Sequence, residues 1–149
     1  MKPEFLNTYI DVRTANGLAD VLLDALEFQA AAGTLYQAPP GSTTDGVSTP
    51  RFLWRIIPPN GDADFLPAVL HDAAYRNGLL IYCPVNDTWR RANLTQRQAD
   101  RLLREALLAN GVGFLKRNVI YFALRLFGGQ AFREDRRAGQ AAFDEGRNK

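Results

Sequence analysis

Apolar residues recur with two different spacings along this chain, and the change of spacing divides it in two. Two β-compatible runs, 22–29 (LLDALEFQ) and 33–39 (GTLYQAP), stand on either side of a short break, with Gly33 next to it. Strand-like runs separated by a glycine-bearing break are typical of a β-hairpin. From about residue 64 onward the apolar positions follow helical spacing instead. The first third is therefore expected to form strands and the remainder helices.

Four helices are expected in the remainder. The first runs over about 64–77 and ends at Gly78, and residues 79–94 read as an irregular connection. The second begins with the capping-box pair Thr95 and Gln98 and ends at Gly111. The third and fourth helices are expected over Phe114–Phe127 and Gln130–Phe143.

The third of these helices is apolar on nearly every side, which predicts a central position in the fold. Between the strands and the helices, residues 39–50 (PPGSTTDGVSTP) form a long turn-rich loop, and a short helix is expected after Pro50. The sequence thus predicts a single α+β domain over residues 1–149, in which an N-terminal β-hairpin or small sheet precedes a bundle of about four helices. Residues 1–19 and 144–149 are expected to be peripheral.

Composition narrows the function classes. The 149 residues are 46% hydrophobic and 23% charged, which is ordinary for a globular protein, and the net charge of +2 is too small to indicate nucleic-acid binding. Arginines cluster between residues 90 and 104, where a solvated helix face is the simplest interpretation. A single cysteine, Cys83, excludes an internal disulfide and suits a reducing compartment. The sequence shows neither a signal peptide nor a run long enough to span a membrane.

The only histidine lies in the stretch HDAAYRNG, residues 71–78. On a helix His71 and Tyr75 share a face, while Asp72 points about 100° away. His71 and Asp72 can therefore serve different purposes. Histidine suits a general base because its ordinary pKa lies near neutrality, and such a base needs a third group to orient it. Asp100, at the edge of the buried stripe of the second helix, is the candidate for that group.

A metal site is a second possibility in the same region. Asp45 lies between glycines 41 and 46, which would let backbone carbonyls approach an ion. Together with Asp72 it would form an oxygen-rich set, for which calcium is expected, magnesium is a weaker alternative and zinc is unlikely.

Purely structural interpretations of these residues remain open. His71 is equally explained as a core polar residue with a carboxylate partner, and Tyr75 as plain core. Asp45 can cap a turn, and Asp72 can form an ion pair with Arg76 one helical turn away.

Two resemblances add expectations. The ordered segments PPGSTTDGVSTPRFLW, LPAVLHDAAYR, TQRQADRLLREAL and IYFALRLFG resemble a phage and prophage family known only as a domain of unknown function (number thirteen fifty-three), over about residues 20–133. The resemblance implies a phage or prophage origin, synthesis in the cytoplasm of a bacterial host and, as one possibility, incorporation into the phage particle. It implies no activity.

The segment HDAAYRN is also similar to the active-site helix of phospholipases A2, especially the bacterial ones. This similarity implies that His71 activates water, that Asp72 binds calcium, and that Tyr75 hydrogen-bonds the carboxylate that orients the histidine, a role open to Asp100. Leu70 and Ala74 stand where those enzymes have disulfide-bonded cysteines.

Two classes of function follow. One is a His-Asp hydrolase that acts on a lipid or another ester, with calcium dependence as one form of it. The other is a non-enzymatic component or assembly factor of a phage particle, associated with the tail, with an exposed apolar patch around residues 51–59 (RFLWRIIPP). A host-directed effector is a third possibility on which the sequence gives no information.

Overall fold

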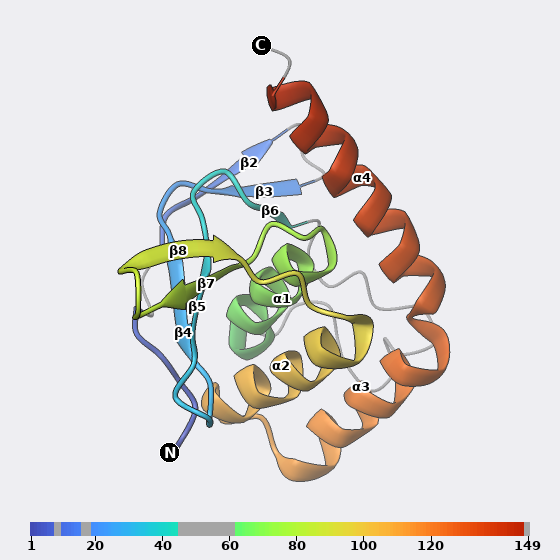
Figure 1. The fold of residues 1–149 in the computed structure, drawn as a ribbon. Helices are drawn as coiled ribbons and strands as arrows, with labels where there is room; N and C mark the ends of the chain where they lie inside the picture. The colour runs from blue at the N-terminus through green and yellow to red at the C-terminus, as the bar shows by residue number, and fades with distance from the viewer. Residues whose placement is uncertain (8–9, 16–18, 45–61, 148–149) are drawn as a thin grey trace.

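The computed structural model describes residues 1–7, 10–15, 19–44 and 62–147. Within these ranges two antiparallel sheets lie on one side of the molecule and helices on the other, with the helix α4 running along the edge toward the C-terminus (Figure 1). The predicted α+β class, with small sheets at the N-terminal side and four helices in one domain, is confirmed. In the described part of the chain no helix is long and apolar enough to cross a membrane. The short helix expected after Pro50 lies outside the described residues.

A five-stranded antiparallel sheet with the order β1-β4-β5-β7-β8 forms the larger of the two sheets. The predicted hairpin forms the inner strands β4 and β5 of this sheet, which pair in the register Leu26↔Ala38 to Gln29↔Leu35. Gly33 in the connecting turn has φ +83°, a left-handed conformation that glycine adopts at little cost. A second sheet has the order β2-β3-β6. The strands are β1 (Glu4–Phe5), β2 (Val12–Ala15), β3 (Ala19–Leu22), β4 (Leu26–Gln29), β5 (Leu35–Ala38), β6 (Thr43–Thr44), β7 (Leu80–Cys83) and β8 (Thr88–Arg91).

The prediction of an irregular connection over residues 79–94 is wrong, because this stretch contains the hairpin β7–β8. β7 also pairs with β5, so the hairpin extends the sheet by two strands. Pro84, which cannot donate to a strand ladder, comes directly after β7, and Asp87 turns the chain with φ +50°. Strand β8 lies at the sheet edge with its residues largely exposed, so it lacks the apolar alternation by which strands are recognised.

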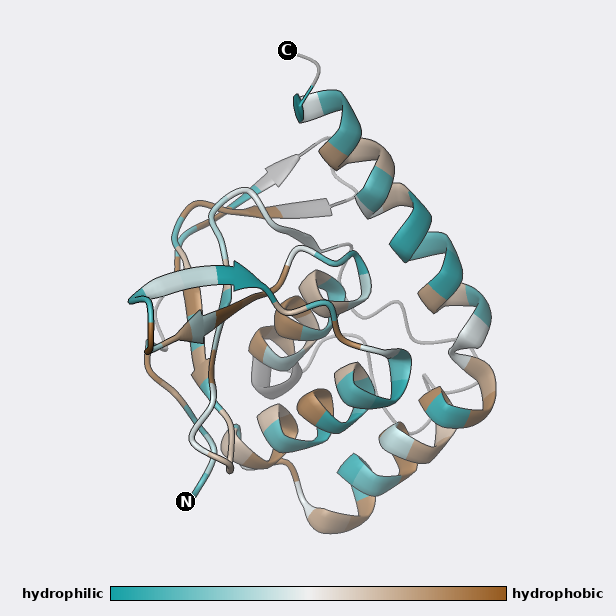
Figure 2. Cartoon of the chain, viewed as in Figure 1, coloured by the Kyte–Doolittle hydropathy of each residue, from teal (hydrophilic) through white to brown (hydrophobic). Residues whose placement is uncertain are grey.

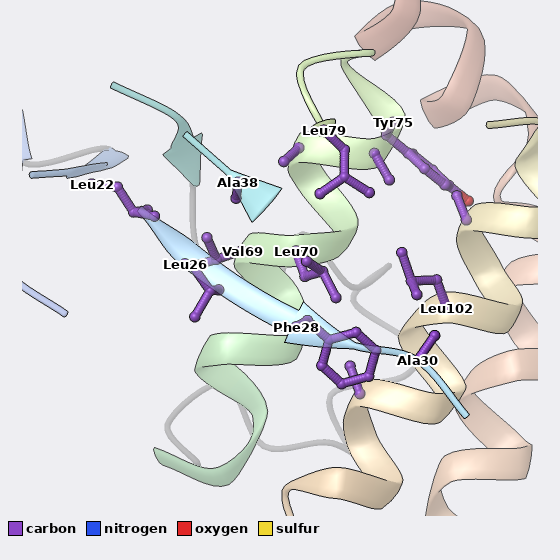
Figure 3. Packing of buried hydrophobic residues seen from close by; sticks show 14 residues of the cluster. Leu22, Leu26, Phe28, Ala30, Ala38, Val69, Leu70, Tyr75, Leu79 and Leu102 are labelled. Carbon is purple, nitrogen blue, oxygen red and sulfur yellow. The ribbon is translucent and has the colours of Figure 1, made fainter. Parts of the chain in front are cut away.

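The main core lies between the larger sheet and the first two helices (Figure 3). Leu26 and Phe28 of β4 are fully buried and pack toward Val69 and Leu70 of α1, with Leu102 of α2 at the far side. The two apolar residues of β4 are two positions apart, so both point to the same face of the sheet. The helices are α1 (Asp62–Tyr75), α2 (Gln96–Ala109), α3 (Phe114–Phe127) and α4 (Gly129–Arg147).

Helix α2 follows its sequence signals closely. The Thr95 side chain accepts a hydrogen bond from the Gln98 backbone N–H, and the Gln98 side chain accepts one from the Thr95 backbone N–H. This reciprocal capping fixes the start of the helix. Helix α4, by contrast, continues to Arg147, one turn beyond its expected end.

The central position expected for α3 is wrong. Of its 14 residues only Ile120 and Ala123 are buried, and they pack on the α2 side in a small second cluster. The hydrophobic turns of α3 lie at the outer edge of the fold (Figure 2). Apolar composition on all sides therefore does not reflect burial in this helix. Likewise, Arg90 and Arg91 lie on β8, so only part of the arginine cluster belongs to a helix face.

Candidate active site

The last turn of α1 holds the HDAAYRN segment in place. The helix ends at Tyr75, and Asn77 adopts the left-handed conformation with φ +59°, which terminates it. The Gly78 N–H then donates to the carbonyl of Ala73, 2.8 Å away. His71 and Tyr75 therefore lie one turn apart on the same face, with ring centroids separated by 4.0 Å.

Asp100 of α2 receives three side chains from two neighbouring helices. His71 Nε2 lies 3.2 Å from Oδ1, and the Tyr75 hydroxyl donates to the same oxygen over 2.7 Å. Arg125 of α3 donates from Nη1 to the other oxygen, Oδ2, over 3.2 Å. The Asp100 side chain is fully buried, and a carboxylate in such a position is stable only when paired and hydrogen-bonded. These contacts supply both conditions.

The contacts determine which atoms can handle a proton. A carboxylate paired with a guanidinium only accepts hydrogen bonds, so His71 Nε2 carries the hydrogen that faces Asp100. The lone pair of the neutral imidazole is then on Nδ1. The His71 side chain keeps about 10% of its surface exposed, so the ring is nearly but not wholly enclosed. Burial, followed by the hydrogen bond to Asp100, raises the pKa of Tyr75, so its hydroxyl stays protonated and can donate even above the ordinary tyrosine pKa.

The Tyr75 ring is itself held by residues from the C-terminal part of the chain. Phe132 of α4 meets it edge to face with ring centroids 5.1 Å apart. Gly128, between α3 and α4, is so close that a Cβ there would lie 3.1 Å from the Tyr75 hydroxyl. All four helices thus position the His71–Tyr75–Asp100 cluster.

Asp72 faces a different neighbourhood, as the helical spacing requires. Its Oδ2 accepts a hydrogen bond from the Thr44 hydroxyl over 2.7 Å, and both residues are buried. Asp45, the other candidate metal ligand, follows Thr44 directly but lies outside the described residues. Among the described residues no group of three or more His, Cys, Asp and Glu side chains could hold a metal ion. The oxygen donors that are described, Asp72 and Thr44, are of the kind that hard cations such as calcium prefer.

Two residues of this region were not expected. Arg125 carries one of the few charges of α3, and a single cation far from the other charges of an apolar helix is a signal for a buried partner. Thr44 was part of a turn-rich loop, and only its proximity to Asp45 in sequence pointed to the site.

The fold and the cluster define a class: an α+β domain in which a histidine is oriented by a buried carboxylate that a tyrosine and an arginine also bind. The chain belongs to the family described as protein of unknown function (DUF1353), whose model matches residues 20–124. Comparison with curated proteins and with solved structures found no significant match.

Proposed function

We propose that the protein is a hydrolase that cleaves an ester bond, with a lipid ester as the substrate class. The observation that carries the proposal is the contact of His71 Nε2 with the buried carboxylate of Asp100, which leaves Nδ1 as the basic nitrogen. The similarity of HDAAYRN to the phospholipase A2 helix supports the substrate class.

In the proposed reaction His71 Nδ1 takes a proton from a water molecule as the water oxygen bonds to the ester carbonyl carbon. The tetrahedral intermediate then breaks its bond to the leaving oxygen, which receives the same proton from the imidazolium. Asp100 stabilises the transient imidazolium, and Tyr75 and Arg125 keep Asp100 in place. The products are a carboxylic acid and an alcohol.

Asp72 and Asp45 would hold a divalent cation, with calcium preferred and magnesium the weaker alternative. When bound, such an ion would polarise the ester carbonyl and stabilise the oxyanion. The buried position of Asp72 and its contact with Thr44 support this assignment, because they orient a carboxylate toward the start of the loop that contains Asp45.

The decisive experiment measures hydrolysis of a short-chain phosphatidylcholine kept monomeric in solution. His71→Asn retains a polar side chain of similar size but no base, so we expect activity to fall at least a hundredfold. Circular dichroism should remain native. Full activity in His71→Asn would refute the proposal.

The metal is tested by thermal unfolding in EDTA, calcium, magnesium and zinc. A ligand that binds only the folded state stabilises it by about 2.7 kcal/mol at a hundred times its dissociation constant. We expect a calcium-specific increase that Asp72→Asn abolishes and that Asp144→Asn, a control on α4, retains. An equal increase in both variants would exclude Asp72 as a ligand.

A second candidate function is a non-enzymatic, tail-associated component or assembly factor of a phage particle. The observation that favours it is the exposed apolar side of α3. The patch expected around residues 51–59 lies outside the described residues. Co-purification with particles at fixed stoichiometry, without any response to metals, would support this alternative.

A further inference from the structure

Helix α3 exposes large apolar side chains along its whole length. Leu115, Phe122 and Leu126 are 76%, 61% and 75% exposed, and their spacing of seven and four residues places them on one side of the helix. Phe114, at the first turn, is 67% exposed. These four residues are called the α3 apolar face below. Soluble proteins seldom expose such a continuous apolar surface unless it binds something.

The charges beside this face are mostly positive. Helix α3 contains Lys116, Arg117 and Arg125 and no acidic residue, and of these Arg125 is paired with the buried Asp100. The adjoining surface of α2 adds the exposed residues Arg101 and Arg104. The face is therefore bordered by cations, which favours an anionic partner.

A hollow of about 300 Å³ lies where α2 and α3 meet, and Arg101, Arg104 and Arg117 line it together with Glu105 and Leu108. The single carboxylate, Glu105, accepts a hydrogen bond from the Ala31 N–H over 2.8 Å, and the three guanidinium groups outnumber it, so the hollow is cationic. Three guanidinium groups around one small hollow match the oxygen atoms of a phosphate group.

Aromatic contacts join the hollow to the α3 apolar face. The Arg117 guanidinium lies 5.3 Å from the centre of the Phe114 ring, and that of Arg104 lies 5.8 Å from the centre of Tyr121. The Tyr121 ring in turn meets Phe122 with centroids 5.4 Å apart. Arg117 is also held by its hydrogen bond to the Val112 carbonyl. Phe114 and Tyr121 thus link the cationic hollow to the apolar face around the side of the helix.

We propose that this surface docks onto an anionic phospholipid bilayer. The lipid phosphate would occupy the arginine-lined hollow, and Leu115, Phe122 and Leu126 would enter the interface between headgroups and acyl chains. A helix that presents Phe and Leu on one side, with Lys and Arg beside them, has the composition of an interfacial membrane-binding helix.

The charges disfavour the other occupants. Self-association through this face would bring two cationic borders together, which opposes a symmetric dimer. A partner protein would need a groove with an acidic border to fit a convex helix surface, whereas an anionic bilayer provides both the apolar layer and the negative charge. Binding to a bilayer requires no catalysis. The inference therefore rests on the proposed function only in that both involve a lipid.

The test is co-sedimentation of the full chain with vesicles of phosphatidylglycerol or of phosphatidylcholine, in EDTA. We expect binding to phosphatidylglycerol that weakens when salt is raised from 0.1 to 0.5 M, as electrostatic attraction is screened. The double variant Leu115→Gln, Phe122→Gln should bind at least tenfold more weakly, since two large side chains no longer leave water. Val85→Gln, which replaces an exposed apolar residue in the β7–β8 turn, is the matched control and should bind as the wild type does.

The charged part is tested in the same way. Arg104→Gln should reduce binding to phosphatidylglycerol several-fold, whereas Arg137→Gln on the exposed side of α4 should not. Binding of inorganic phosphate that requires Arg104, with no binding to vesicles, would overturn the proposal and assign the hollow to a free phosphate compound.

Failure of the two proposals can be told apart. His71→Asn should bind vesicles normally, and the Leu115→Gln, Phe122→Gln variant should still hydrolyse a monomeric ester. If the wild type binds vesicles but does not hydrolyse the ester, the proposed function is removed and the docking surface remains. Absence of vesicle binding by the wild type would overturn the docking proposal, and so would a wild-type dimer that Phe122→Gln dissociates.

Discussion

Replacing Asp100 by asparagine tests how much of the fold depends on the buried carboxylate. The amide has nearly the same shape, so its oxygen can still accept from Tyr75 and face His71. Its NH₂ group must then take the position of Oδ2, the oxygen that accepts the hydrogen bond from the Arg125 guanidinium in the wild type. A donor would thus face a donor at about 3 Å, and the negative charge that balances Arg125 would be lost.

The magnitude follows from these contacts. The variant loses one hydrogen bond between charged groups, which is worth about 1.5–3 kcal/mol. Arg125 is one-third exposed and can turn toward water, which lowers the penalty for its unpaired charge. We expect Asp100→Asn to reduce the free energy of unfolding by about 2 kcal/mol, which corresponds to about 4–8 °C in Tm for a chain of this length.

Urea unfolding of Asp100→Asn, Arg125→Met and the double variant measures the coupling between the two residues. Methionine removes the cation, so the amide of the double variant no longer meets a donor. The double variant should therefore lose about 1–2 kcal/mol less than the sum of the single losses. Ester hydrolysis should stay low in the double variant, because His71 has still lost its carboxylate. Additive losses, or an Asp100→Asn chain as stable as the wild type, would refute the reasoning.

Two further predictions concern Tyr75 and the packing of α4. Because burial and Asp100 raise the pKa of Tyr75, the folded chain keeps a proton that the unfolded chain loses near pH 10, so stability should fall above that pH by up to about 1.4 kcal/mol per unit. Unfolding measured between pH 8 and 11 should show a smaller fall in Tyr75→Phe than in the control Tyr121→Phe, and equal slopes would contradict the assignment. A Cβ on Gly139 would lie 1.8 Å from the Arg76 carbonyl oxygen, so Gly139→Ala should lower the free energy of unfolding by about 1–3 kcal/mol. Gly146 has open space around it, so Gly146→Ala should be neutral or should raise the free energy of unfolding by up to about 1 kcal/mol. A change of the same sign in the unfolding free energy of both variants would show that α4 does not pack against the end of α1.

Features that depend on local chemistry could be predicted from the sequence. The capping box of α2 joins residues three positions apart, and the β4–β5 hairpin needs only a short turn with Gly33. The proximity of His71 to Tyr75 likewise follows from helical geometry alone. Their contact with Asp100 depended on one additional argument, that a carboxylate bordering a core needs a partner.

Features that depend on distant contacts could not be predicted in this way. The strand β7 is defined by its pairing with β5, more than 40 residues earlier, and nothing in its own residues indicates that partner. Arg125 lies 25 residues after Asp100 on another helix, so its pairing depends on how α2 and α3 pack.

The error at α3 is informative because it has a physical cause. A helix that is apolar on all sides is normally buried, since each exposed large side chain stays in contact with water. In α3 the inward positions Ile120 and Ala123 satisfy the core, whereas the outward positions Leu115 and Phe122 contribute nothing to it among the described residues. Burial in the described core therefore explains only part of the apolar pattern of this helix. The proposed docking surface explains the rest, and the cations beside it favour a negatively charged partner.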